Sequence, residues 1–105
     1  MDELSIVYCT VPADGRADDL IGKLVTNRLA SCVNVIEDLY SVYYWEDKVC
    51  RDEEKLLIIK TLKNKVNDVF DFIKENHPYS TPERISIAVA DCGNDYLKWA
   101  NDYLK

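Results

Sequence analysis

Hydrophobic side chains alternate along some stretches of this chain and recur every three or four residues along others, so both strands and helices are predicted. β-Branched and aromatic residues dominate residues 4–11, and Pro12 closes this first predicted strand. Apolar residues then recur at helical spacing over residues 17–29, which predicts an amphipathic helix.

The middle of the chain has the pattern of a long β-hairpin. Residues 31–36 and 39–45 are rich in strand-forming side chains, and residues 49–62 form their predicted partner strand. Glu46-Asp47-Lys48 is the predicted turn. We expect the hairpin to bend where Glu37-Asp38 and the run 51–54 interrupt the hydrophobic pattern, and we interpret the acidic residues of that run as a solvated bulge.

The last third of the chain predicts a helix, a strand and a second helix. Asn64 is the expected N-cap of the first helix, and His77-Pro78 ends it because the residue before proline avoids the helical region. Residues 84–89 alternate between apolar and small or polar side chains, and Gly93-Asn94-Asp95 opens a terminal helix. The order β-α-β-β-α-β with an extra C-terminal helix predicts one α+β, ferredoxin-like domain over residues 1–105.

Two predicted strands have too many apolar residues for a sheet that exposes one face to solvent. Neither Leu56-Leu57-Ile58-Ile59 nor the stretch 32–36 alternates cleanly. The hairpin tip adds a cluster of aromatic residues typical of interfaces, formed by Tyr40, Tyr43, Tyr44 and Trp45. We therefore expect sheet-to-sheet packing in a closed oligomer, with a self-contained hairpin as the alternative.

Charge and cysteine content narrow the classes of partner. With 19 acidic and 13 basic side chains, the formal net charge is -6, which disfavours nucleic acid and anionic membrane surfaces. No apolar run has the length of a membrane span, and the first residues lack the features of a signal peptide. The four cysteines form no C-x-x-C pair, so free thiols and a cytoplasmic location are expected.

Few residues have the chemistry of a functional site. Motifs of nucleotide-binding loops and serine hydrolases are absent and there is one histidine, so an enzyme is disfavoured. His77 is either a cap on the carbonyls of its helix or a metal ligand. Cys9 and Cys32, which we expect on neighbouring strands, are either buried hydrophobes or ligands of a soft ion such as copper or zinc. Cys50 and Cys92 look peripheral.

Six separated segments resemble the CutA divalent-cation tolerance family along essentially the whole chain. They are Cys9-Thr10-Val11-Pro12, Arg28-Leu29-Ala30-Ser31-Cys32-Val33-Asn34, Tyr44-Trp45-Glu46-Asp47-Lys48, Leu57-Ile58-Ile59-Lys60-Thr61, His77-Pro78-Tyr79-Ser80-Thr81-Pro82-Glu83 and Gly93-Asn94-Asp95-Tyr96-Leu97-Lys98-Trp99. The resemblance implies a ferredoxin-like homotrimer, similar in build to the PII proteins, with a role in tolerance to copper and other divalent ions.

The same resemblance implies the site residues. Copper ligation is expected at Cys9, His77 and Glu83. The positions expected near a cleft between subunits are Cys32, Trp45, Lys60, Tyr79 and, again, Glu83. The alternative function is a trimeric sensor or scaffold that binds a small anionic ligand or a protein in that cleft, where Trp45 stacks and Lys60 and Arg28 hold charge.

Overall fold

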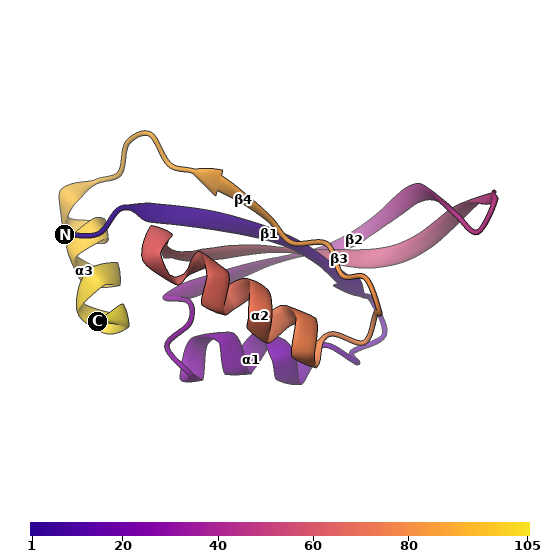
Figure 1. The fold of residues 1–105 in the computed structure, drawn as a ribbon, viewed down its shortest axis with the longest axis horizontal. Coiled ribbons are helices and arrows are strands. Elements are labelled where there is room, and N and C mark those ends of the chain that lie inside the picture. The colour runs from indigo at the N-terminus through magenta and orange to yellow at the C-terminus, as the bar shows by residue number, and fades with distance from the viewer.

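The computed structural model describes all 105 residues and contains one four-stranded sheet with three α-helices (Figure 1). The elements in chain order are β1 (Leu4–Pro12), α1 (Asp18–Thr26), β2 (Cys32–Trp45), β3 (Lys48–Leu62), a 3-10 turn (Lys63–Lys65), α2 (Val66–Asn76), β4 (Ile85–Ala88) and α3 (Asn94–Leu104). The strand order is β2-β3-β1-β4, and every neighbouring pair is antiparallel. This confirms the predicted α+β, ferredoxin-like arrangement with an added C-terminal helix.

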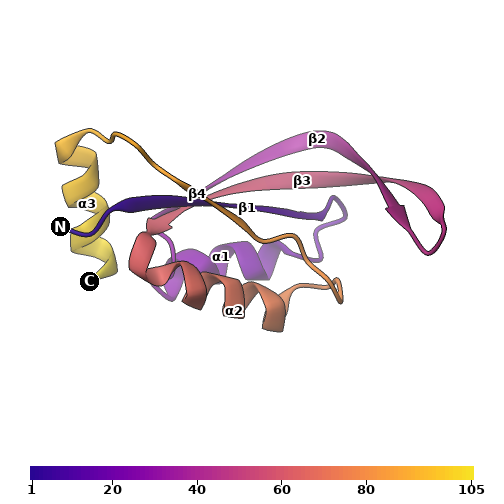
Figure 2. The same cartoon turned by 45° about the horizontal axis from the view of Figure 1, so that its top comes forward.

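The core lies between one face of the sheet and the helices α1 and α2, which both pack on that face (Figure 2). Alternate residues of β1 and β3 point into this core, among them Val7 and Ile59. Leu24 of α1 and Ile73 of α2 meet them, and all four side chains are fully buried. The alternation of the strands and the spacing of the helices therefore bury one continuous apolar layer.

Two helix boundaries differ from the sequence prediction. α1 ends at Thr26 rather than near Leu29, because Arg28 adopts a left-handed backbone with φ of 56° that cannot continue the helix. Asn64 is not an N-cap: it lies in the 3-10 turn, and its side-chain amide donates to the carboxylate of Asp2 at 3.0 Å. The predicted end of α2 at His77-Pro78 is confirmed, because His77 is the extended C-cap residue.

The hairpin formed by β2 and β3 is long and bent, as predicted, and its tip extends away from the helices (Figure 1). The register shifts between Ile36 and Leu39, where Asp38 has a positive φ of 60°, so a β-bulge interrupts the ladder. Glu46 and Asp47 alone form the turn at the tip, and Lys48 already belongs to β3.

The second face of the sheet is largely uncovered, and we call it the open face. Ile85 and Ile87 of β4 lie on it and are 53% and 42% exposed. Their neighbours on the central strands include Ile6 and Ile58, which have the same strand parity. α3 lies at one end of this sheet (Figure 1), where the ammonium of Lys60 sits 5.9 Å from the ring centre of Tyr96. None of the helices combines the length and the apolar character required to cross a membrane.

Candidate functional site

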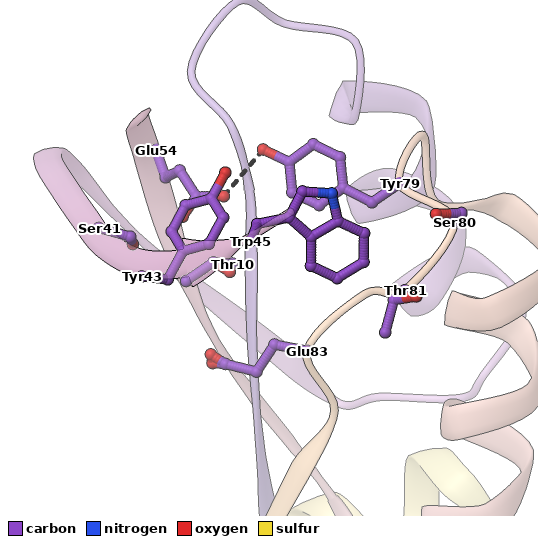
Figure 3. Close-up of a pocket in the computed structure, with 9 residues that line it drawn as sticks. All are labelled: Thr10, Ser41, Tyr43, Trp45, Glu54, Tyr79, Ser80, Thr81 and Glu83. Atoms are coloured by element: carbon purple, nitrogen blue, oxygen red, sulfur yellow. Dashed lines mark hydrogen bonds between the residues drawn. The ribbon is translucent and has the colours of Figure 1, made fainter. Parts of the chain in front are cut away.

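A cavity of about 420 Å³ lies between the hairpin and the segment that joins α2 to β4 (Figure 3). Its walls come from β1, β2, β3 and that connecting segment. The lining residues are Thr10, Ser41, Tyr43, Trp45, Glu54, Tyr79, Ser80, Thr81 and Glu83. Because three of them alternate along β2, one face of the hairpin forms a wall of the cavity. Four separate parts of the sequence thus meet here.

Glu54 is the most deeply buried polar residue of the cavity, with 4% of its surface exposed. Its position on β3 pairs with Pro12 of β1 and with Leu39 of β2, so backbone flanks it on both sides. The hydroxyl of Tyr79 donates to its carboxylate at 2.8 Å (Figure 3). Burial and this bond to Glu54 raise the pKa of Tyr79. This hydrogen bond between Tyr79 and Glu54 thereby holds the segment between α2 and β4 against the sheet.

Glu83 supplies a second carboxylate to the same cavity. Burial raises the pKa of Glu83, and the nearby charge of Glu54 raises it further. No lysine or arginine is among the lining residues. The cavity therefore has two acidic groups that repel one another and no internal counter-charge, a setting that favours a positively charged ligand.

Three aromatic side chains, Tyr43, Trp45 and Tyr79, complete the lining (Figure 3). The hydroxyl of Tyr43 donates to Asp52 on the neighbouring strand, and that bond is the main reason that the pKa of Tyr43 rises to about 12. The ring of Tyr79 packs on His77 with 4.7 Å between ring centres. Both tyrosines are thus held in place by contacts outside the cavity.

His77 lies beside the cavity but does not line it. Its Nδ1 accepts the backbone N–H of Tyr79 at 3.0 Å, and its Nε2 lies 2.8 Å from the carbonyl oxygen of Thr10. Since a carbonyl can only accept, Nε2 carries the proton and the imidazole is neutral. The ring does not reach the last carbonyls of α2, so the predicted side-chain cap is wrong; the backbone N–H of His77 bonds to Ile73 instead.

Cys9 is fully buried and faces the helices rather than the cavity, because its neighbour Thr10 has the opposite strand parity. Burial raises the pKa of Cys9 to about 12, and the charges of Glu83 and Glu54 add to the effect. Without a metal the thiol is therefore protonated at neutral pH, and a metal ion would have to displace this proton to bind.

The three predicted copper ligands, Cys9, His77 and Glu83, do not form a metal centre within one chain. No group of three or more histidine, cysteine, aspartate or glutamate side chains is placed to hold a metal ion. Glu83 alone lines the cavity, while both nitrogens of His77 are already bonded. A ligand role for Cys9 or His77 stays a prediction that requires these contacts to break.

Apart from Glu83, which lines the cavity, the predicted cleft residues fall into two pairs. Trp45 and Tyr79 line the cavity, whereas Cys32 and Lys60 lie opposite one another on β2 and β3. Lys60 is six residues along β3 from Glu54, a separation of about 20 Å. Within one chain these pairs do not meet.

The cysteines are all free thiols. The sequence predicts Cys9 and Cys32 on neighbouring strands. This prediction is wrong, because β3 lies between β1 and β2. Cys50 and Cys92 are partly exposed and lie outside the cavity.

Glu54 is the main site residue that the sequence analysis missed. It stood within the run 51–54, which we had interpreted as solvated. The signal was its parity: Glu54 shares a face of β3 with Leu56 and Ile58, so its side chain follows apolar neighbours onto the sheet. The sequence indicates Tyr43 only as one of the aromatic residues of a predicted interface.

Both the sequence and the fold are similar to those of known proteins. Residues 5–103 match the model of a family described as CutA1 divalent ion tolerance protein. A protein CutA homolog of Xenopus laevis is 41% identical over 99 residues, which cover 94% of this chain and 66% of the frog protein, just under two thirds. The divalent-cation tolerance protein CutA of Salmonella newport is 36% identical over 103 residues, covering 98% of this chain and 90% of the bacterial protein. The crystal structure of CutA1 from Oryza sativa has a TM-score of 0.94 at 36% identity, covering 99% of this chain and 95% of the rice chain.

Proposed function

Because the chain belongs to the CutA1 divalent ion tolerance family, we propose that it is a homotrimer that binds divalent metal ions in the cavity beneath the hairpin. The observation that carries this proposal is the pair Glu54 and Glu83, two carboxylates in one cavity without a basic residue. Burial and, after it, the charge of Glu54 raise the pKa of Glu83, and a bound dication would relieve the second of these effects. The family description names ion tolerance and no reaction, and we propose no enzymatic activity.

The donors of the cavity fit an oxygen-coordinated ion. Carboxylates of Glu54 and Glu83, with hydroxyls such as that of Thr10, are hard ligands that suit divalent ions including manganese and magnesium. Copper gains more from thiolate and imidazole. The thiol of Cys9 and the ring of His77 do not fit that role in the isolated chain, for the reasons given above. Copper therefore remains one of the ions to be tested.

Assembly into a trimer is supported by the open face. A monomer would leave Ile85 and Ile87 in water, together with Tyr40 and Tyr44 of the hairpin, which do not line the cavity. A second subunit is also the means by which the pair Cys32 and Lys60 could approach Trp45 and Tyr79. Free thiols at all four cysteines support a reducing, cytoplasmic location as part of this proposal.

The alternative ligand, a small anion, receives less support. The cavity is lined by two carboxylates and no cationic group. Lys60 contacts Tyr96, and the guanidinium of Arg28 lies 4.5 Å from the ring centre of Tyr103, at the end of the sheet near α3. An anion site would need these residues to come from another subunit.

The test is a metal titration of the reduced full chain against a competing chelator, with the mass in solution measured on the same sample. We expect a trimer that binds manganese or copper saturably, with binding lost in Glu83→Gln and kept in Glu75→Gln, a change of the same kind on exposed α2. Saturable binding that survives both Glu83→Gln and Glu54→Gln would remove the cavity from the metal site. Loss of copper binding in His77→Ala alone would restore the ligand set implied by the family resemblance.

A further inference from the structure

The geometry points to a second kind of ligand for this cavity: we propose that it binds a small organic ammonium ion between the aromatic side chains Tyr43, Trp45 and Tyr79 and the carboxylates Glu54 and Glu83. This inference goes beyond metal binding and does not depend on it, although the two cations would compete for the same carboxylates.

The size of the cavity fits an organic molecule better than a bare ion. A volume of about 420 Å³ lies within the range of small-molecule sites. A metal ion needs donors that converge to within about 2.0–2.6 Å of one point. No such group of three acidic, histidine or cysteine side chains exists here, so most of the space is left for other atoms.

The aromatic lining supplies the attraction that a substituted ammonium ion needs. The face of an aromatic ring carries partial negative charge, and cations sit over it within about 6 Å of its centre. Tyr43 and Trp45 come from β2, and Tyr79 comes from the opposite side of the cavity (Figure 3). A metal ion would use none of these rings, whereas methyl or methylene groups on a cationic nitrogen would contact them.

Both tyrosine rings are also fixed and polarised. Tyr79 donates its hydroxyl to Glu54, and Tyr43 donates its hydroxyl to Asp52. A phenol that donates to a carboxylate gains electron density in its ring, which strengthens the attraction to a cation. Because these bonds hold the rings in the free protein, little ordering is required when a ligand enters.

The charge of the cavity selects the sign of the ligand. Within one chain, Glu54 and Glu83 are the only charged side chains in the lining, so a cation gains from both and an anion is repelled. The hydroxyls of Thr10, Ser41, Ser80 and Thr81 can accept the N–H groups of a primary or secondary ammonium.

The experiment is a titration of the full chain with tetramethylammonium chloride, observed through the methyl resonance of the ligand and compared with sodium chloride at equal ionic strength. tert-Butanol, a neutral molecule of similar size and shape, is titrated in parallel. We expect saturable tetramethylammonium binding in about the millimolar range, as befits a ligand of five heavy atoms. tert-Butanol should bind about tenfold more weakly because it lacks the charge.

Variants separate the rings from the carboxylates. Trp45→Leu should weaken tetramethylammonium binding about tenfold, while Trp45→Phe, which restores an aromatic face, should stay within a few-fold of wild type. Trp99→Leu is the matched control, because Trp99 is similarly exposed but lies on α3 outside the cavity. The double variant Glu54→Gln with Glu83→Gln should abolish the preference for tetramethylammonium over tert-butanol.

Several outcomes would overturn the inference. No saturable binding of tetramethylammonium to the wild-type chain would do so, as would equal affinity for tert-butanol or equal losses in Trp45→Leu and Trp99→Leu. Manganese binding that persists in Trp45→Leu while tetramethylammonium binding is lost would support the inference, because the ring would then be needed for the organic cation and not for the metal ion. Absence of metal binding with tetramethylammonium bound would refute the proposed metal function and leave this inference standing.

Discussion

His77 has both ring nitrogens in hydrogen bonds within the chain, and its place at the edge of the sheet explains why. β4 pairs with β1 only over residues 5–8, so the carbonyl of Thr10 extends beyond the end of β4. The Nε2–H of His77 bonds to this carbonyl, and Nδ1 accepts the N–H of Tyr79. The ring therefore completes the sheet edge and positions the segment that lines the cavity.

Replacing His77 by alanine should lower the free energy of unfolding by about 1–3 kcal/mol, because the partly buried carbonyl of Thr10 and the N–H of Tyr79 lose their partner. Urea unfolding at fixed protein concentration measures the loss. Asn76→Ala is the control, since that exposed side chain bonds only to the carbonyl of Phe72 and should change stability by less than about 0.5 kcal/mol. Equal stability of wild type and His77→Ala would show that the ring does not complete the edge.

The raised pKa of Glu83 predicts that its contribution to stability falls as pH rises, whereas the contribution of an ion-paired carboxylate grows. Its pKa in the folded chain lies above the ordinary value of 4.5, through burial and the charge of Glu54. The stability it contributes is therefore full below the unfolded pKa and is lost as pH rises through the folded pKa. Glu83→Gln, which does not titrate, should gain stability relative to wild type as pH rises from about 4 to about 7.

The expected gain is at most about 1 kcal/mol, because Glu83 is partly exposed and its charge is screened by solvent. Urea midpoints at both pH values, in metal-free buffer, provide the measurement. Glu75→Gln on the exposed side of α2 serves as the control. A wild-type advantage that grows with pH would contradict the assigned sign.

Sequence reasoning found part of the site. The resemblance to the family predicts Trp45, Tyr79 and Glu83 as positions near a cleft, and all three line the cavity. The bond between Glu54 and Tyr79 and the environment of His77 were not foreseeable, because each depends on a contact between residues far apart in the chain, at separations of 25 and 67 positions. Residue type shows which chemistry is possible, whereas burial and partners decide which groups are free to perform it.

At the scale of elements, the turn of the hairpin is strained. Glu46 and Asp47 have φ values of 49° and 63°, both in the left-handed region that glycine adopts at least cost. Two-residue hairpin turns with this backbone favour glycine at the second position. The turn is therefore expected to limit the stability of the hairpin.

Asp47→Gly should raise the free energy of unfolding by about 0.5–1 kcal/mol, since it removes the left-handed strain of a residue with a Cβ. Lys48→Gly, one residue further in β3, should lower stability by a similar amount because a strand position gains nothing from glycine. Thermal unfolding at matched protein concentration compares the three chains. A decrease in both variants would mean that the turn is not strained.

Most elements were predictable because their patterns are local. The alternation in β1 and the His77-Pro78 stop of α2 follow from rules that involve only a few neighbouring residues. The end of α1 was misplaced because the apolar spacing continues to Leu29, while the left-handed Arg28 turns the chain. Arg28 is held there by tertiary contacts: its guanidinium donates to the carbonyl of Tyr103 on α3 at 2.6 Å.

The whole molecule presents one covered and one open face of the sheet. α1 and α2 cover the first face (Figure 2). The second face exposes the isoleucines of β4 next to those of the central strands. Both β2 and β4 are edge strands with a free side. Contiguous apolar surface of this kind in a protein with a formal net charge of -6 is best explained by burial against other copies of the chain.

Ile87→Glu tests this explanation, because it places a charge on the open face, on the edge strand β4 and opposite Ile6. A carboxylate buried between subunits without a partner is strongly unfavourable, so the solution mass should fall from that of a trimer toward that of a monomer. Ser86→Glu is the matched control: it puts the same charge on the same strand, on the other face, and should leave the trimer intact. Light scattering gives the mass, and circular dichroism verifies that each variant is folded. A trimer that persists in Ile87→Glu would mean that the open face is not the interface, and Tyr40 and Tyr44 of the hairpin, which are exposed outside the cavity, would then be the side chains to alter.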